Sequence, residues 1–204
     1  MSKSKILNLY AGIGGNRALW GDDYEITAVE NNREIALEYK RRYPNDNVII
    51  ADAHEFLINN FIDFDFIWSS PPCPTHSKAN NSLKGYGIYR YPDFNLYQEI
   101  VFLKNFFKGI FVVENVKPYY KPIVEPSAEI DRHFFWTNFE LGNFEVTRDH
   151  NVARANKETL ATSLRVQIPE IKDSRKALRN MVNPKIGEFI FQQVKQLLQR
   201  GEGE

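Results

Sequence analysis

The feature that most limits the fold is the alternation of short apolar segments with polar or amphipathic ones along the first half of the chain. Short runs of β-branched and aromatic residues have the length and composition of strands. They cover residues 5–10, 24–30, 48–50, 64–69 and 110–114. Three of these runs are almost wholly apolar, as in strands covered on both faces of a parallel sheet. The pattern predicts an α/β fold: a doubly wound, mostly parallel, Rossmann-like sheet with ligands at the carboxyl ends of its strands.

Helical periodicity fills the gaps between these strands. Residues 16–20 are expected to form one or two helical turns, and residues 33–43 place apolar side chains on one helical face. A further helix is expected at about 94–107. An apolar helix is expected at about 184–199, near the end of the chain. The length of 204 residues matches the size of one domain, so we expect a single domain over residues 1–204.

Charge is balanced over the whole chain but not along it. Lys plus Arg and Asp plus Glu each number 26, which excludes a generally polycationic nucleic-acid binder. Residues 147–180 nevertheless carry eight basic and four acidic side chains, whereas residues 1–146 carry 15 and 19. We therefore expect a small basic element at about 142–179 that tracks phosphates, with Arg154 and Arg165 among its contacts.

Cysteine content and hydropathy limit the setting of the protein. A single cysteine and four histidines exclude an internal disulfide and give no ligand spacing for zinc, so no metal is expected. No apolar run approaches the ~20 residues of a membrane helix, and the start MSKSKILNLY lacks the pattern of a signal peptide. These features predict a cytoplasmic protein that does not enter a membrane.

A glycine-rich turn follows the first strand. Gly12, Gly14 and Gly15 let the backbone turn tightly and approach a ligand closely, because glycine has no Cβ. Glu30, at the end of the next strand, is placed to accept hydrogen bonds from the two hydroxyls of a ribose. Asp52 ends the third strand, where it either accepts from an adenine amino group or caps the helix that follows.

The only cysteine lies in a loop after the fourth strand, in the sequence SSPPCPTHS. Cys73 is flanked by prolines and polar residues, whereas a core cysteine would lie within an apolar run, so we expect its thiol to act as a nucleophile. His76 is a candidate base for it, although a loop gives the pair no fixed geometry. Glu114 ends the fifth strand, where burial would raise its pKa and let it hold a proton at neutral pH.

Taken in order, these motifs resemble those of the cytosine-C5 DNA methyltransferase family. LNLYAGIGG resembles the first cofactor motif, AVENN the ribose-binding segment and ADA the adenine-binding one. SSPPCP resembles the catalytic loop, FVVENV the Glu-Asn-Val motif, DRHFF the Arg-x-Arg-x-Phe motif and RNMVNP the last motif. The resemblance extends over residues 5–198 and so covers almost the whole chain.

The resemblance implies one catalytic domain that transfers a methyl group from S-adenosylmethionine to C5 of cytosine in DNA. It implies catalytic roles for Cys73, which would attack C6 of a flipped-out base, and for Glu114 and Arg132. The residues implied to bind the cofactor are Tyr10, Ala11, Gly12, Ile13, Gly14, Gly15, Glu30, Asn31, Asp52, Ala53, Pro71, Asn180 and Val182. The residues implied to contact DNA are Ser77, Lys78, Asn80, Asn115, Arg154 and Arg165. The first three of these lie in an expected lid over residues 75–92.

The chain departs from the family pattern at several positions. Tyr10 stands for the usual Phe, Pro74 for Gln, His76 for Phe, Ile130 for the first Arg of its motif, Arg179 for Gly and Asn183 for Pro. The segment between Arg132 and the last motif is much shorter than in other members, and we expect residues 142–179 also to supply the last strand or strands of the sheet. Either the target sequence is short, or a second protein supplies target recognition.

Two alternatives remain open. Methylation of cytosine in RNA would use similar chemistry, but the RNA-dedicated family has a second cysteine where this chain has Glu114. The Cys-Phe-Thr signature of the transfer-RNA enzymes is also absent. A catalytically silent DNA-binding subunit of a modification complex would have no chemical need to combine Cys73, Glu114 and Arg132. The family also implies a prokaryotic or phage-encoded setting in restriction and modification.

Overall fold

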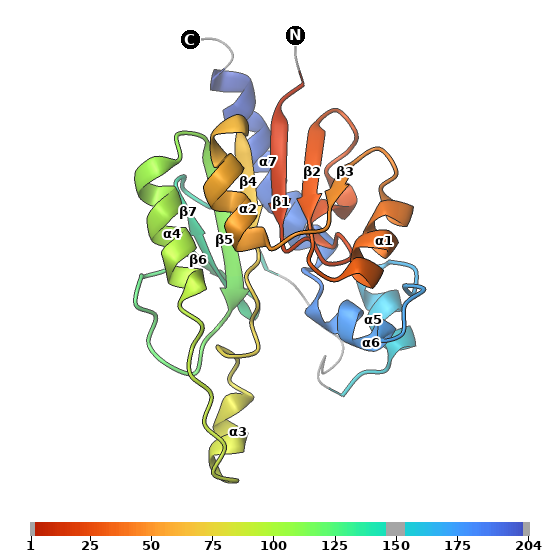
Figure 1. Cartoon of the computed structure of the whole chain (residues 1–204), viewed down its shortest axis with the longest axis vertical. Helices are drawn as coiled ribbons and strands as arrows, with labels where there is room; N and C mark the ends of the chain where they lie inside the picture. The colour runs from red at the N-terminus through yellow and green to blue at the C-terminus, as the bar shows by residue number, and fades with distance from the viewer. Residues whose placement is uncertain (1–2, 146–153, 202–204) are drawn as a thin grey trace.

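The computed structural model describes residues 3–145 and 154–201. Within them, one sheet holds seven strands in the order β3-β2-β1-β4-β5-β7-β6 (Figure 1). The first five strands are parallel, and β7 runs antiparallel to both of its neighbours. The strands are β1 Lys5–Leu9, β2 Glu25–Val29, β3 Asn47–Ile49, β4 Phe66–Ser69, β5 Ile110–Val116, β6 Ala128–Ile130 and β7 His133–Thr137.

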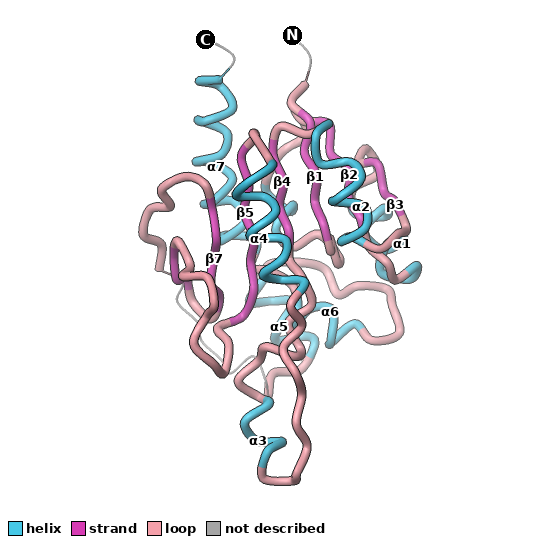
Figure 2. The backbone as a smooth tube through the Cα atoms, turned by 60° about the vertical axis from the view of Figure 1, so that its left-hand side comes forward, coloured by secondary structure: helices cyan, strands magenta, loops and turns pink. Residues whose placement is uncertain are grey.

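Helices cover both faces of this sheet, which makes three layers (Figure 2). On one face lie α2 Ala53–Asn60 and α4 Asn95–Phe106, and on the other lie α1 Arg33–Arg42 and α7 Pro184–Gly201. The shorter helices are η1 Asn16–Leu19, η2 Phe61–Asp63, α3 Asn80–Lys84, α5 Lys157–Leu164 and α6 Ser174–Asn180. No helix in the described part of the chain is both long enough and apolar enough to cross a membrane.

The side-chain alternation of β1 explains the two helical layers. Leu7 packs in one cluster with Leu57 of α2 and Leu103 of α4, whereas Ile6 packs in another with Ile190 of α7. All five side chains are fully buried. Because successive residues of a strand point to opposite faces, apolar neighbours such as Ile6 and Leu7 need cover on both sides of the sheet.

A buried ion pair fixes the chain where it leaves the glycine turn. Arg17 of η1 donates from Nε and Nη2 to the two carboxylate oxygens of Asp46, over 2.9 and 3.1 Å. The hydroxyl of Tyr39 donates to the same carboxylate over 2.8 Å. Both charged side chains are only 4% exposed. Removal of Arg17 would leave the buried carboxylate of Asp46 without its ion-pair partner, which is costly. The pair therefore holds η1 against α1 and the segment before β3.

The structure confirms the predicted fold class and finds all five predicted strands within two residues of their expected ends. The helices expected at 33–43, 94–107 and 184–199 are α1, α4 and α7, and residues 16–20 form a 3-10 turn. β5 extends two residues beyond its expected end, to Val116, because Asn115 and Val116 pair with β7.

The expectation that residues 142–179 supply the last strands of the sheet is wrong. The last strands are β6 and β7, which precede this segment, and its described part holds α5 and α6 instead. The reason is a tight reversal at Asp131, whose φ of +57° turns the chain so that the apolar run at 133–137 pairs with β5. Arg148, the start of the expected recognition loop, lies outside the described residues.

Parallel pairing brings several chain segments to one edge of the sheet. Leu9 at the end of β1 lies opposite Val29 of β2 and Ser69 of β4, and Ser69 lies opposite Val113 of β5. The residues that follow these positions emerge at the lower end of the molecule in Figure 1, where α3, α5 and α6 also lie.

Candidate active site

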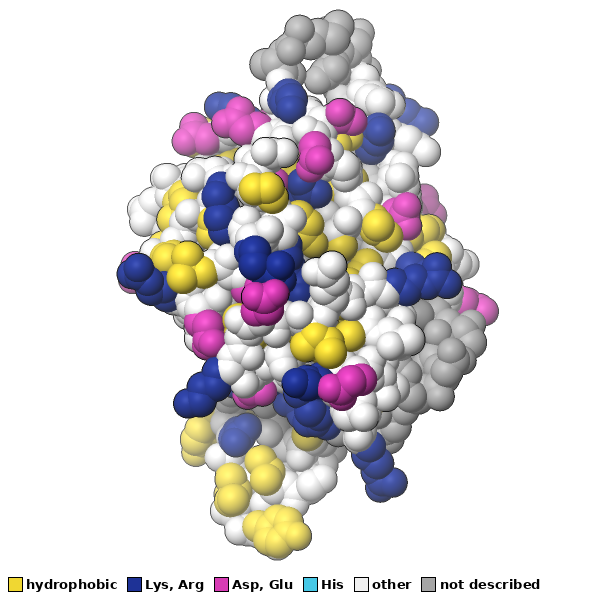
Figure 3. Space-filling view, turned by 90° about the vertical axis from the view of Figure 1, so that its right-hand side faces the viewer, with side chains coloured by type: hydrophobic (Ala, Val, Ile, Leu, Met, Phe, Trp, Pro, Cys, Tyr) yellow, Lys and Arg dark blue, Asp and Glu magenta, His cyan; other side chains and the backbone are white. Residues whose placement is uncertain are grey.

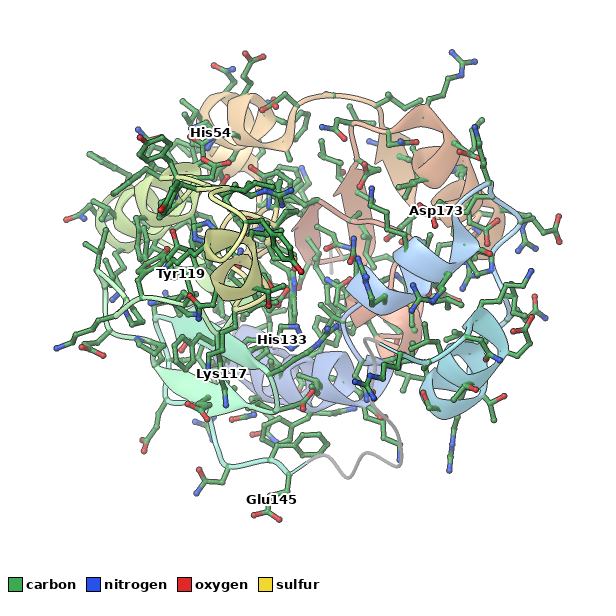
Figure 4. The ribbon with its side chains drawn as sticks, turned by 90° about the horizontal axis from the view of Figure 1, so that it is seen from below. His54, Lys117, Tyr119, His133, Glu145 and Asp173 are labelled. Atoms are coloured by element: carbon green, nitrogen blue, oxygen red, sulfur yellow. The ribbon has the colours of Figure 1, made fainter. Side chains whose placement is uncertain are left out.

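A cavity of about 450 Å³ opens at this edge. Its walls come from the segments that follow β1, β2 and β4, from the start of α2, from the last residues of β5, from the start of β7 with the residue before it, and from the α6–α7 region. Figure 4 views the molecule from this end: His133 of β7 and Asp173 at the start of α6 both line the cavity, from different sides. No group of three or more His, Cys, Asp or Glu side chains among the described residues could hold a metal ion.

The glycine turn forms one wall and is held by Glu30. Gly12 has a φ of +55°, and a Cβ there would meet no atom closer than 4.0 Å, so this residue faces open space. Its N–H donates to Glu30 Oε2 over 3.1 Å, and the N–H of Asn32 donates to Oε1 over 2.8 Å. Gly14 differs, because a Cβ there would lie 2.2 Å from the ring of Tyr43. Gly14 therefore serves packing, while Gly12 leaves room for a ligand.

Asp52 occupies the position of a helix cap. Its side chain is exposed and accepts from the N–H of Glu55 over 2.9 Å, which caps α2. The neighbouring Ala53 is buried and lines the cavity, whereas Asp52 does not. Of the two interpretations of Asp52, the structure shows the cap.

One buried carboxylate joins three segments that contribute residues to the cavity walls. Glu99 of α4 is fully buried and accepts from Tyr10 OH and Ser69 Oγ, each over 2.6 Å. His54 Nδ1 lies 3.0 Å from the same carboxylate, and this hydrogen bond raises the pKa of His54. Tyr10 has a φ of +54°, a strained conformation for a residue with a Cβ. Glu99 thus ties the glycine turn, the end of β4 and the start of α2 to α4.

Two asparagine side chains hold the loop that carries Cys73. The buried amide of Asn115 donates to the carbonyl of Pro71 over 2.8 Å, and that of Asn80 donates to the carbonyl of Pro74 over 2.8 Å. The ring of His76 is buried outside the cavity lining, with Nδ1 2.6 Å from Tyr120 OH, so the structure does not support a role as the base for Cys73.

Glu114 is buried beside Cys73 and faces the same cavity. Burial raises its pKa from 4.5 to about 7, although a hydrogen bond from Ser70 and the charge of Arg132 act in the opposite direction. His133 Nε2 lies 3.4 Å from Glu114 Oε1. The expectation that Glu114 can hold a proton near neutral pH therefore has a structural basis.

Cys73 and Arg132 complete this end of the cavity. Burial, together with the charge of Glu114, raises the pKa of the Cys73 thiol, while the charges of Arg132 and Arg179 lower it. Arg132 donates from Nη2 to the carbonyl of Arg179 over 2.7 Å, which links the turn before β7 to the end of α6. The site therefore combines a thiol, a carboxyl group and a guanidinium within one pocket.

All of the cofactor candidates from the sequence line the cavity except Gly14 and Asp52. The catalytic candidates Cys73, Glu114 and Arg132 also line it, as does Asn115. The other DNA-contact candidates lie outside it: Ser77, Lys78, Asn80, Arg154 and Arg165.

Sequence reasoning missed Ser70, His133 and Glu99. Ser70 and His133 lie within the quoted motifs SSPPCP and DRHFF, and this position was their only signal.

Most of the residues that line the cavity lie within a recognised family region. A protein-family model described as "C-5 cytosine-specific DNA methylase" matches residues 4–124, more than half of the chain. The chain belongs to the C-5 cytosine-specific DNA methylase family. Its glycine turn, Glu30, Cys73 and Glu114 fall inside the matched region, whereas Arg132 and the α6–α7 region follow it.

S-adenosylmethionine is the methyl donor of C-5 cytosine-specific DNA methylases, and the cavity fits such a group. Its size suits a nucleoside-sized ligand. Gly12 leaves open space in the turn, Glu30 offers carboxylate oxygens at the end of β2, and the apolar Ile13, Ala53 and Val182 line the walls.

Solved structures give a consistent fold. The Entamoeba histolytica methyltransferase EhMeth is 9% identical, covers 97% of this chain and 99% of its own, and has a TM-score of 0.58, which shows a shared fold. A variant of Spodoptera frugiperda DNMT2 is 28% identical over 59% of this chain, with a TM-score of 0.42. The match covers only 38% of the length of that DNMT2 protein. No curated protein sequence gave a significant match.

Glu114 predicts a pH dependence of stability. Because its folded pKa of about 7 lies above its ordinary value of 4.5, the folded state binds the proton more tightly, and stability is lost as pH rises through this window. Between about pH 5 and pH 8, wild type should lose ~2–3 kcal/mol of unfolding free energy relative to Glu114→Gln. Urea unfolding of both proteins at each pH measures the difference. If the unfolding free energies of wild type and Glu114→Gln changed equally with pH, the raised pKa of Glu114 would be contradicted.

Proposed function

We propose that this chain methylates C5 of cytosine in DNA, with Cys73 as the covalent nucleophile. The observation that carries the proposal is that Cys73, Glu114 and Arg132 line the same cavity as the glycine turn and Glu30. One pocket can therefore hold a methyl donor at one end and a base at the other.

Cys73 would make the base reactive. C5 of cytosine is a weak nucleophile, so its direct methylation is slow. Attack of the Cys73 thiolate on C6 forms an S–C6 bond and gives C5 the character of an enamine carbon. C5 then takes the methyl group, loses its proton to a base, and the S–C6 bond breaks to release Cys73.

Glu114 and Arg132 would stabilise the charge that this attack creates. Attack at C6 pushes electron density toward N3 and O2 of the ring. A protonated Glu114 can donate to N3, and the guanidinium of Arg132 can bind O2. The structure supports the first role through burial of Glu114, which raises its pKa to about 7.

The cofactor residues would be divided between the two ends of the donor. Glu30 and Asn31 would bind the ribose, Ala53 and Pro71 would pack near the adenine, and Asp52 would remain mainly a helix cap. Asn180 and Val182 would close near the methionine end. When bound, S-adenosylmethionine supplies an electrophilic methyl group on its sulfonium.

The target base must leave the stack to reach this cavity, which costs a few kcal/mol. Ser77 and Lys78 in the segment 75–92, together with Arg154 and Arg165 in the segment 142–179, would contact the DNA backbone. Asn80 and Asn115 would not contact DNA through their amides, because these amides already donate to carbonyl groups of the Cys73 loop. We assign these two a positioning role.

Target recognition would be limited or shared. The described part of residues 142–179 packs back on the enzyme: Leu160, Leu178 and Met181 form one cluster with Ile13 of the glycine turn. Little of this segment is then left to enter a groove of DNA. The proposal therefore includes a short target sequence or a second protein that supplies recognition.

Covalent capture tests Cys73 directly. In DNA that carries 5-fluorocytosine, C5 has no proton to lose, so the S–C6 bond should persist. With cofactor present, wild type should give a shifted band on a denaturing gel, and Cys73→Ser should give none. Glu114→Gln should slow capture by about 100-fold or more, the size of an acid–base contribution.

Unmodified cytosine DNA serves as the control and should leave no lasting band. Absence of capture by wild type on DNA of varied sequence would contradict the proposal. Capture on RNA alone would move the substrate to RNA, and no capture on either would favour a silent subunit.

Cofactor binding tests Glu30. Glu30→Gln keeps the size of the side chain but removes the charge that would accept from ribose hydroxyls. Calorimetry should show S-adenosylmethionine affinity reduced about 10- to 100-fold, as for a lost charged hydrogen bond. Glu55→Gln, an exposed substitution on α2, should bind as wild type does. Equal affinities for Glu30→Gln and wild type would remove Glu30 from the site.

A further inference from the structure

A projecting segment lies next to the cavity. Residues 75–92, which we call the finger, leave the Cys73 loop, include α3 and return to α4. The finger extends from the end of the molecule where the cavity opens, well beyond the sheet (Figures 1 and 2). Cys73 and Pro74, just before the finger, line the cavity, but no residue of the finger does. Its composition therefore needs its own explanation.

The end of the finger presents aromatic rings to water. Tyr86, Tyr89 and Tyr91 are 81%, 73% and 89% exposed, and Ile88 beside them is 49% exposed. Figure 3 shows hydrophobic side chains gathered on the lower tip of the molecule. Large apolar groups clustered on a surface mark an interaction site more often than single exposed ones do.

The charge of the finger indicates the kind of partner. Residues 75–92 contain no Asp or Glu, and they carry Lys78, Lys84 and Arg90, all exposed. Basic side chains interleaved with exposed aromatic rings are the combination that binds unpaired nucleic-acid strands: the cations follow phosphates and the rings stack on bases. An acid-free surface of this kind is complementary to a polyanion.

The base of the finger is fixed although its end is exposed. Asn80 binds the carbonyl of Pro74, and the buried ring of His76 contacts Tyr120. Farther along, Tyr119 OH donates to the carbonyl of Arg90 over 3.0 Å. These contacts hold the tyrosines at a set position relative to Cys73. A strand bound by the finger would therefore lie at the end of the molecule where the cavity opens (Figure 1).

We propose that Tyr86, Tyr89 and Tyr91 form a stacking platform for unstacked bases of the strand whose cytosine enters the cavity. This inference rests on the proposed function for the identity of that strand. Every base has a π-face, so the platform would add affinity without sequence preference. It would favour single-stranded or locally opened sites, and it would supply binding that the short segment at 142–179 does not.

Binding to a cytosine-free strand tests the platform separately from catalysis. The probe is a fluorescent oligothymidylate of about 12 nucleotides, a length within the usual site size of single-strand binding domains. Because thymidylate offers no cytosine, Cys73 chemistry cannot contribute. Fluorescence anisotropy should show that the Y86A/Y89A/Y91A variant binds about tenfold or more weakly than wild type. The Y86F/Y89F/Y91F variant, which keeps the rings, should bind as wild type does.

Two controls sharpen the result. Ile62→Ala and Phe106→Ala remove exposed apolar groups elsewhere on the surface and should leave binding unchanged. The salt dependence should stay the same in the alanine variant, because no cation is removed, and should weaken when Lys78, Lys84 and Arg90 are replaced by Ala.

The proposal is overturned if the alanine variant binds oligothymidylate within about twofold of wild type. It is also overturned if the alanine variant changes only self-association or the binding of a protein partner. A parallel oligouridylate arm shows whether the platform distinguishes DNA from RNA. Capture of 5-fluorocytosine DNA by the same variants reports the proposed function independently.

Discussion

The buried carboxylate of Glu99 is the interaction on which the arrangement of the cavity depends. A carboxylate with no exposed surface must be met by donors, since burying an unpaired charge is costly. Here the donors are Tyr10 and Ser69, with His54 as a third partner. Tyr10 lines the cavity, and Ser69 and His54 are next in sequence to the lining residues Ser70 and Ala53. The glycine turn, the segment before Cys73 and the start of α2 are therefore positioned together. This link also explains how Tyr10 is held at a positive φ.

At the end of the cavity that holds Cys73, the electrostatics depend on whether Glu114 carries a proton. Burial disfavours charge on both Glu114 and Cys73, and the charge of Glu114 further raises the pKa of the thiol. A proton on Glu114 removes that repulsion and at the same time provides a donor for the base. Arg132 lowers both pKa values and offers the cation that a thiolate and a developing ring anion need. Protonation of Glu114 and reactivity of Cys73 are therefore coupled in this account.

The central sheet and most of the cavity were predictable because both follow from local pattern. Apolar runs gave the strands, and parallel pairing then forces Gly12, Glu30, Cys73 and Glu114 to one edge, however far apart they lie in sequence. Glu99 was not predictable in the same way. It lies in an ordinary amphipathic helix, and only its contacts with Tyr10 and Ser69 reveal it.

The second half of the chain was harder to predict because tertiary packing decides it. The positive φ of Asp131 creates the β6–β7 hairpin, and no apolar pattern signals that turn. In residues 142–179 the charges suggested an element that tracks the phosphates of DNA, but in its described part Leu160 and Leu178 pack on Ile13, which places α5 and α6 against the glycine turn. The backbone N–H of Lys172 also donates to Glu34 of α1 over 2.7 Å.

The central claim is that this cavity directs a methyl group to C5 of cytosine. Mass spectrometry of nucleosides, after DNA is incubated with the protein and S-adenosylmethionine carrying an isotopically labelled methyl group, tests it most directly. We expect label in 5-methyldeoxycytidine alone, and none when Cys73→Ser replaces wild type. Label on an exocyclic nitrogen of cytosine or adenine, or 5-methyldeoxycytidine formed equally well by Cys73→Ser, would contradict it.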